Sequence, residues 1–355
     1  MKAAINLGLR GKGLTEPNPL VGALVVDRGK IISTGFHRSF GTPHAEAMAL
    51  KSVSRNHTTL YVPLEPCCHF GINPPCTDLI IQKKVSRVVI ALQDPNPRVN
   101  GKGIEMMKKN DIRIETGCLE KYYARVNRHY LKFMNRKRPY VTLKAGVSLD
   151  GKLTDKHHRS KWITDPEMRK FSQSLRSEFS AILVGGRTVL VDDPHLTIRE
   201  RGWGDKRLYR VVLDTHNQLD LNQKIFRQQQ RFPLILFSSQ TAANRTPKVD
   251  NHHFIKSDGE FLDLNRVLKI LARYRIASVL VEGGGQVINS FLNKKLADEL
   301  ILFTASKVIG GSDSVELFAS GVSLSGPIRL IHRRIMNLGS GYVIRGSINP
   351  LFSGG

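Results

Sequence analysis

The pattern of hydrophobic and polar positions in the first part of the chain predicts alternating strands and helices. Apolar runs at residues 21–26 and 30–36 flank Asp27-Arg28-Gly29 and predict a β-hairpin. Runs of the same kind predict further strands at 60–64, 86–92 and 112–116. Helical periodicity predicts helices at 3–12, 44–53, 77–84 and 119–138. The order of these elements indicates a sheet flanked by helices.

The strand pattern restarts after a basic run that ends at Arg138. We therefore place a domain boundary there and expect two domains, residues 1–138 and 139–355. In the second domain the pattern predicts helices at 261–273 and 286–296 and a hairpin at 328–348. Predicted strands lie at 140–147, 181–184, 210–213, 234–237, 253–255, 278–281 and 300–304. Both domains are thus expected to be of the α/β class.

Composition narrows the class of protein. The chain has 355 residues, 41% hydrophobic and 24% charged, which fits a globular protein with two cores. No signal-peptide-like run opens the sequence and no stretch approaches the length of a membrane span, so we expect a cytoplasmic protein without a membrane partner. The four cysteines, at 67, 68, 76 and 118, do not resemble a disulfide framework. Their clustering favours a reducing compartment and a metal site.

The net charge of +24 invites a nucleic-acid interpretation. However, both domains are basic and no long tail accounts for the excess. A diffuse positive charge also suits small phosphorylated ligands, or it reflects compositional drift. We rank both explanations above nucleic-acid binding.

The most informative residues in the first half are His44, Glu46, Cys67 and Cys76. One His and two Cys can hold zinc and leave its fourth tetrahedral position for water. Glu46, two residues after His44, can reach that water without binding the metal. The pattern H-x-E…P-C…C is that of zinc-dependent nucleobase deaminases. The alternative, that these are ordinary core residues, is disfavoured because three ligands and an acid coincide, each beside a proline or a helix start.

The second half offers a glycine-rich turn, Glu282-Gly283-Gly284-Gly285, between a predicted strand and a predicted helix. Such a turn suits a dinucleotide phosphate, because glycines allow close backbone approach and the helix N-terminus attracts anions. Alone the signal is weak, since it lacks the G-x-G-x-x-G spacing and a plain tight turn is the alternative.

Over about residues 3–345 the chain resembles the bifunctional riboflavin-biosynthesis deaminase–reductase family. In the first half the matching segments are 17–22, His37, 41–46, 64–67, His69, Gly71, 74–76 and 93–97. In the second half they are 148–151, 160–164, 185–189 and 192–199. The resemblance implies a cytidine-deaminase-like α/β/α domain followed by a dihydrofolate-reductase-like α/β domain that uses NADPH.

For the first domain, the resemblance implies zinc on His44, Cys67 and Cys76, with Glu46 as the catalytic proton carrier. The implied reaction is deamination of 2,5-diamino-6-(5-phosphoribosylamino)pyrimidin-4-one. One departure stands out: the family commonly has Lys or Arg followed by Thr just before Pro-Pro-Cys, where this chain has Ile72 and Asn73. We therefore expect a phosphate-facing cation to be missing there.

For the second domain, the resemblance implies NADPH-dependent reduction of the ribosyl group of the product to ribityl. Lys144 and Asp150 are candidate proton donors. The implied substrate positions are Ser160, Arg176, Leu196, Arg199 and Glu282, with the two arginines suited to bind phosphate. The implied cofactor positions are Val147, Trp162, Thr188, Asp192, Thr215, Gly284, Gly285, Gln286, Val287, Ile288, Asn289 and Ser290. We also expect a homo-oligomer with small-molecule partners.

Two competing interpretations remain to be weighed. An RNA- or nucleoside-acting zinc deaminase with an accessory domain would normally show C-x-x-C, whereas Cys67 and Cys76 have eight residues between them. It would also leave the second-half motifs unexplained. A basic nucleic-acid-binding protein with a structural zinc would normally present four protein ligands. Zinc content and a salt-dependent RNA-binding assay separate these alternatives.

Overall fold

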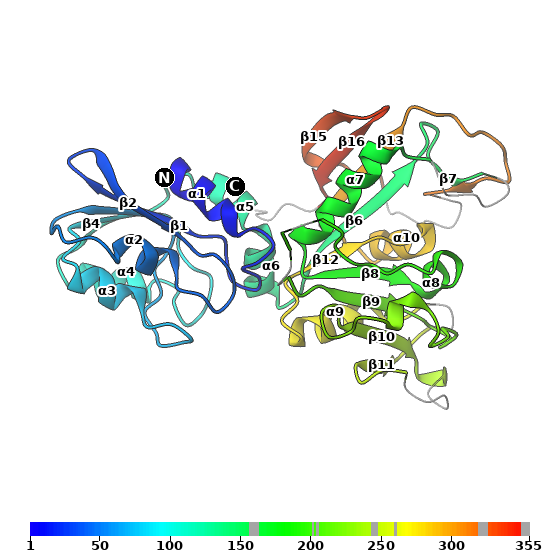
Figure 1. The fold of residues 1–355 in the computed structure, drawn as a ribbon, viewed down its shortest axis with the longest axis horizontal. Helices are drawn as coiled ribbons and strands as arrows, with labels where there is room; N and C mark the ends of the chain where they lie inside the picture. Colours follow the sequence, from blue (N-terminus) through cyan, green and yellow to red (C-terminus); the bar gives the residue numbers. More distant parts are fainter. Residues whose placement is uncertain are drawn as a thin grey trace. The chain divides into compact units, whose positions relative to one another are not determined.

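The computed structural model describes residues 1–155, 163–200, 202–203, 206–242, 248–258, 261–318 and 326–348 (Figure 1). The chain divides into two compact units, Met1–Lys137 and Arg138–Gly355, each with its own hydrophobic core. In the described part of the chain, no helix is long and apolar enough to cross a membrane.

The first unit is built on a mixed five-stranded sheet in the order β2-β1-β3-β4-β5. Strand β1 runs antiparallel to both β2 and β3, whereas β3, β4 and β5 are parallel. The strands are β1 (Gly22–Asp27), β2 (Lys30–Phe36), β3 (Thr59–Leu64), β4 (Arg87–Leu92) and β5 (Arg113–Glu115). The internal strand β4 is buried from Val88 to Ala91, as expected for a parallel strand covered on both faces.

Seven helical segments accompany this sheet: α1 (Lys2–Gly8), η1 (Leu9–Gly11), α2 (Ala45–Leu50), α3 (Cys76–Gln82), α4 (Lys102–Lys108), α5 (Glu120–Val126) and α6 (Arg128–Arg136), counted over the described residues. Helix α2 packs beside α3, and α3 beside α4. Gly35 lets α2 lie directly on β2, since a Cβ there would stand 2.4 Å from the backbone nitrogen of Ala49. The predicted strands of this half are all present.

The single helix predicted at 119–138 is wrong, because the structure breaks it into α5 and α6 at Asn127. The side chain of Asn127 accepts a hydrogen bond from the backbone N–H of Leu20 at 2.7 Å and donates to the Leu20 carbonyl at 3.1 Å. Tyr123 donates to the same carbonyl at 3.2 Å. Long-range pairing therefore overrides local periodicity and holds the loop before β1.

The second unit contains a nine-stranded sheet in the order β11-β10-β9-β8-β12-β6-β13-β16-β15. The seven strands from β11 to β13 in this order are parallel, and β16 and β15 add an antiparallel end. Their bounds are β6 (Tyr140–Val147), β8 (Ala181–Gly185), β9 (Tyr209–Leu213), β10 (Leu234–Ser239), β11 (His252–Ile255), β12 (Ser278–Val281), β13 (Glu299–Ala305), β15 (Ile331–Leu338) and β16 (Gly341–Ser347). A separate two-stranded ladder joins β7 (Lys152–Thr154) and β14 (Val315–Glu316).

The helices of this unit are α7 (Pro166–Ser174), η2 (Leu175–Glu178), α8 (Gly186–Asp192), η3 (Lys224–Phe226), η4 (Gln240–Ala242), α9 (Leu264–Arg273) and α10 (Gly285–Asn293). The predicted helix at 261–273 begins three residues later, because Asp263 accepts hydrogen bonds from the N–H groups of Asn265 and Arg266 and caps it. Its predicted apolar face is buried. The α/β class predicted for both halves is confirmed.

Candidate active sites

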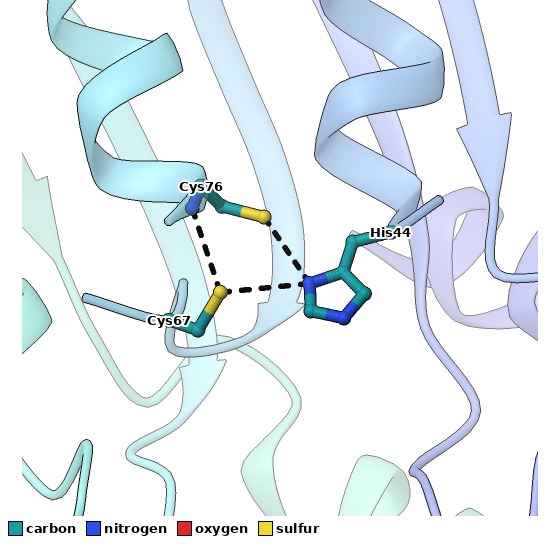
Figure 2. A group of neighbouring side chains, drawn as sticks. All are labelled: His44, Cys67 and Cys76. Carbon is teal, nitrogen blue, oxygen red and sulfur yellow. Dashed lines mark hydrogen bonds between the residues drawn. The ribbon is translucent and has the colours of Figure 1, made fainter. Parts of the chain in front are cut away.

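Three potential metal ligands meet in the first unit (Figure 2). The Nδ1 atom of His44 lies 3.5 Å from the Cys67 sulfur and 3.4 Å from the Cys76 sulfur. The ligand atoms of the three residues all lie within 4.8 Å of one another. The described residues thus bring together the three side chains that the sequence singled out as zinc ligands.

Local structure fixes each of these side chains. His44 is the N-cap of α2 rather than part of its first turn as predicted, Cys67 lies three residues after β3, and Cys76 is the first residue of α3. The N–H of Cys76 points at the Cys67 sulfur at 3.4 Å. The adjacent helices α2 and α3 therefore present their N-termini to one point beyond the end of β3.

The donor set fits zinc. Zn–S bonds of about 2.3 Å and Zn–N bonds of about 2.0–2.1 Å in tetrahedral geometry place sulfur and nitrogen roughly 3.5 Å apart, close to the observed spacing. Hydrogen bonds from Cys76 and His44 lower the pKa of the Cys67 thiol to about 4. The pKa of Cys76 is raised by its hydrogen bond to Cys67 and by burial. One thiolate is thus already favoured, and a bound cation would draw the second thiol to the same form.

Glu46 lies in the first turn of α2 and is 4% exposed. Burial and the Cys67 thiolate raise the pKa of its carboxyl to about 7, while His44 opposes the rise. A carboxyl of this kind can both accept and release a proton near neutral pH. The pKa of Glu46 therefore suits its predicted role as proton carrier, which stays a prediction.

Sequence reasoning gave no site role to His37 and Asn18, which pack against this cluster. The His37 ring stands edge-on to the His44 ring, with centroids 5.5 Å apart. Its Nδ1 lies 3.2 Å from the Pro43 carbonyl and its Nε2 3.1 Å from the Asn18 amide nitrogen. These partners assign the proton to Nδ1, and burial lowers the pKa of His37, which keeps it neutral. Both residues lie in segments that match the resembled family. That match is the sequence signal that could have pointed to a role at the site.

Ile72 and Asn73, the two residues that differ from the expected pattern, lie in different environments. Ile72 is 70% exposed, whereas the Asn73 amide donates to the Thr42 carbonyl at 3.0 Å. This hydrogen bond holds Asn73 against the loop that leads into His44. The neighbouring Phe70 is 78% exposed, so the surface of this loop is apolar where the family commonly has a cation.

In the second unit the predicted cofactor positions gather at the carboxyl ends of parallel strands. Val147 ends β6, Thr188 and Asp192 lie in α8 directly after β8, and Thr215 follows β9. Gly284 is the N-cap of α10, and residues 285–290 form its first turns after β12. Ligands of open α/β sheets bind at this edge. Trp162 and Ser160 lie outside the described residues.

Arg176 and Glu282, predicted as substrate positions, form a bidentate ion pair. The nitrogen–oxygen distances are 3.0 and 2.9 Å, and the side chains are 11% and 8% exposed. Burial would raise the pKa of Glu282, but Arg176 and Lys144 lower it to about 2. Arg176 also donates to the Thr197 carbonyl at 3.0 Å, so only part of its guanidinium remains for a ligand.

Lys144 completes this buried cluster. Its ammonium lies 3.5 Å from Glu282 and donates to Ser172 at 2.7 Å. Burial lowers the pKa of Lys144. Lys144 and Arg176 line a cavity of about 240 Å³ together with Gly146, Thr164, Ser172 and Phe303. This cavity could receive a small polar substrate between β6 and α7.

The other predicted site residues, Leu196, Arg199 and Asp150, lie in three different environments. The side chain of Leu196 is 4% exposed and belongs to a hydrophobic cluster, and Arg199 is exposed. Asp150 accepts hydrogen bonds from Ser148 and from the N–H groups of Ile309 and Gly310, which holds its pKa well below the usual range. Asp150 is therefore a poor proton donor.

Comparisons with known families match the two halves separately. Residues 1–92 match the family model of the cytidine and deoxycytidylate deaminase zinc-binding region, and residues 139–344 match that of the RibD C-terminal domain. The riboflavin biosynthesis protein RibD of Aquifex aeolicus is 37% identical, covering 97% of this chain and 96% of that protein. The Escherichia coli protein of the same name is 36% identical, covering 87% and 88%.

Solved structures agree with this assignment. The diaminohydroxyphosphoribosylaminopyrimidine deaminase/5-amino-6-(5-phosphoribosylamino)uracil reductase of Thermotoga maritima superposes with a TM-score of 0.86 at 36% identity, covering 98% of this chain and 97% of that one. One crystal form of Acinetobacter baumannii RibD gives 0.87 at 32% identity and 98% coverage of both chains. The predicted fold classes, a cytidine-deaminase-like domain followed by a reductase domain, are confirmed. Sequence and fold together show that the chain belongs to the RibD family of bifunctional riboflavin-biosynthesis deaminase–reductases.

Proposed function

We propose that residues 1–138 deaminate 2,5-diamino-6-(5-phosphoribosylamino)pyrimidin-4-one and that residues 139–355 reduce the ribosyl group of the product. The observation that carries this proposal is the cluster of His44, Cys67 and Cys76 with Glu46 buried beside it. The same reaction pair appears in the name of the Thermotoga maritima relative. The competing RNA-acting deaminase is not favoured, because the second half matches the RibD C-terminal domain.

In the first domain, we assign zinc to His44, Cys67 and Cys76. Zinc bound there supplies Lewis-acid activation of a water molecule. Glu46 takes a proton from the attacking water and delivers it to the departing amino group, which leaves as ammonia. The raised pKa of Glu46 suits both steps, since a group with a pKa near 7 is readily protonated and deprotonated.

In the second domain, bound NADPH would supply the hydride for reduction of the sugar carbon that carries the amino substituent. The first turn of α10 offers free N–H groups to the cofactor phosphates, and Gly284 exposes that helix end. A proton must reach the ring oxygen of the sugar as its bond to the same carbon opens. We assign this proton to Lys144, because burial lowers its pKa and it faces the cavity, whereas the pKa of Asp150 is held low.

Metal removal is expected to separate the two activities. Dialysis of the full chain against a chelator should abolish ammonia release, because Glu46 alone cannot activate water. The same sample should still oxidise NADPH when given the deaminated uracil substrate. The Cys76→Ala variant should behave likewise, with zinc content measured by atomic absorption. Cys118→Ala, which removes an exposed cysteine away from the cluster, is the matched control and should retain zinc. Full zinc occupancy in Cys76→Ala would contradict the ligand assignment.

Restoring the missing cation is expected to improve substrate binding. Ile72→Lys should lower the Michaelis constant of deamination about tenfold with little change in turnover, because a charge-assisted hydrogen bond to a phosphate contributes about 1.5–3 kcal/mol and lies away from the reacting carbon. The double variant Ile72→Lys with Asn73→Thr tests the family pattern but removes the hydrogen bond from Asn73 to the Thr42 carbonyl. Ile31→Lys, at a 55% exposed position of the β1–β2 hairpin, is the control for added charge. An unchanged Michaelis constant in Ile72→Lys would show that another cation already holds the phosphate.

We also propose a reducing, cytoplasmic setting, supported by the need of a zinc site for reduced thiols. Assembly as a homo-oligomer stays a prediction. The expected partners are small phosphorylated pyrimidines rather than nucleic acid.

A further inference from the structure

A second cavity is lined by residues of the edge strand β11 and of helix α9. Figure 1 shows β11 at the end of the nine-stranded sheet, beyond β10. Its volume is about 640 Å³, larger than the cavity beside Arg176. Small-molecule sites typically span about 300–1,000 Å³. Strand β11 is four places from β12, which leads into Glu282, and two places from β9, which leads into the predicted cofactor residue Thr215. At the usual strand spacing of about 4.8 Å these separations are roughly 19 and 10 Å. The cavity is therefore separate from the substrate cavity beside Arg176.

Cations dominate the wall of this cavity. Arg266, Ile270 and Arg273 lie on one face of α9 because they are spaced four and three residues apart, and Lys256 follows β11. The two arginines stand about 10 Å apart along the helix axis, from a rise of about 1.5 Å per residue. All three cationic side chains are exposed, and none forms an ion pair or hydrogen bond with another described residue. They face one carboxylate, Asp263, which already caps α9.

The floor of the cavity is polar and aromatic, and its hydrogen bonds are fixed. Tyr274 donates its hydroxyl to Asn251 at 3.2 Å and lies 2.9 Å from Nε2 of His253. The hydroxyl therefore accepts the proton on Nε2, which leaves Nδ1 of His253 as an acceptor. His253 is also stacked on Phe237, with ring centroids 5.3 Å apart. Burial lowers the pKa of His253, so its imidazole ring is neutral and presents a flat face for stacking.

These features together define the ligand class. Exposed guanidinium groups with no protein partner bind phosphate bidentately, and two of them at this spacing suit the phosphates of one small molecule. A fixed aromatic floor with a ring-nitrogen acceptor suits a planar heterocycle that carries an N–H donor. We propose that the β11–α9 cavity is a binding site for a nucleoside phosphate, distinct from both catalytic sites.

The test uses the full chain and defined probes at 150 mM salt, by isothermal titration calorimetry. With the cofactor site filled by saturating NADPH, ADP should bind with one site per chain, more tightly than pyrophosphate, and adenosine should bind weakly, because the ring and the phosphates contact different walls. Arg266→Gln combined with Arg273→Gln should weaken ADP binding at least tenfold. The control pair, Lys269→Gln with Lys109→Gln, removes the same charge from exposed positions that do not line the cavity and should bind ADP normally.

Three results would overturn the proposal. Wild-type chain that binds no ADP would show that the cations are only solvated. Equal weakening in the control pair would show diffuse charge attraction. Loss of ADP binding in the presence of saturating NADPH, together with a raised Michaelis constant for NADPH in the arginine pair, would show that the cavity is an extension of the cofactor site. An unchanged Michaelis constant for NADPH with tenfold weaker ADP binding supports a separate site.

Discussion

Replacing Glu46 by Gln is expected to leave zinc bound and to reduce ammonia release by about 10²–10⁴-fold, the usual contribution of a positioned proton carrier. The amide has the shape of the carboxyl but cannot take a proton from water. The variant should fold normally, because Glu46 is 4% exposed and burial already raises the pKa of its carboxyl, so a neutral group suits the site. The measurement is ammonia release under saturating substrate, with zinc content determined on the same sample.

The reductase half supplies an internal control for this variant. NADPH oxidation with the deaminated uracil should be unchanged in Glu46→Gln, whereas oxidation that depends on the deaminase substrate should stop. Glu105→Gln, an exposed carboxylate on α4, is the matched substitution and should retain both activities. Near-normal deamination by a zinc-loaded Glu46→Gln protein would mean that another residue carries the proton.

The proximity of His44, Cys67 and Cys76 could be predicted from sequence because each lies beside a strong local signal. Cys67 follows an apolar strand, and Pro75 precedes the helix that Cys76 opens. Such signals fix where a side chain stands relative to its own element. A shared zinc ion requires the segments that carry these three residues to lie close together. The H-x-E…P-C…C pattern implied such a zinc site.

Features that depend on contacts between distant residues were not predictable in this way. Arg176 and Glu282 are 106 residues apart, and they pair because β12 inserts between β8 and β6. Neither residue has a local signal for the other. The break at Asn127 has the same cause, since its partner Leu20 is 107 residues away.

Three α-helices of the described residues, α4, α7 and α8, were not predicted, and α7 and α8 were missed for different reasons. Helix α7 had a readable start, with Asp165 as N-cap and Pro166 in the first turn, and Asp165 accepts the N–H of Met168. Helix α8 begins with Gly186, a poor helix former. A Cβ at Gly186 would stand 3.2 Å from the Asp214 backbone, so close packing explains that glycine where local propensity does not.

Breaking the buried Arg176–Glu282 pair is expected to have the largest effect on stability. Among the described residues, Arg176→Leu leaves Glu282 with Lys144 as its one cationic partner, 3.5 Å away. The change should reduce the free energy of unfolding of this half by about 3–5 kcal/mol at pH 7. The double variant Arg176→Leu with Glu282→Gln should recover much of this loss, because no uncompensated carboxylate remains. Both tryptophans, Trp162 and Trp203, lie in this half, so their fluorescence during urea unfolding reports its stability.

The loss in Arg176→Leu should also depend on pH. In the unaltered chain the pKa of Glu282 is lowered from 4.5 to about 2, so its contribution to stability is complete above pH 4.5 and is lost only as pH falls toward 2. Without Arg176, burial raises that pKa above its unfolded value, so the charged carboxylate destabilises the fold at pH 7 and is relieved by protonation as pH falls. The difference in unfolding free energy between the variant and the unaltered chain should therefore be smaller at pH 5 than at pH 7. An equal difference at both pH values, or a double variant as unstable as the single one, would show that Arg176 stabilises the fold through packing and its bond to Thr197 rather than through Glu282.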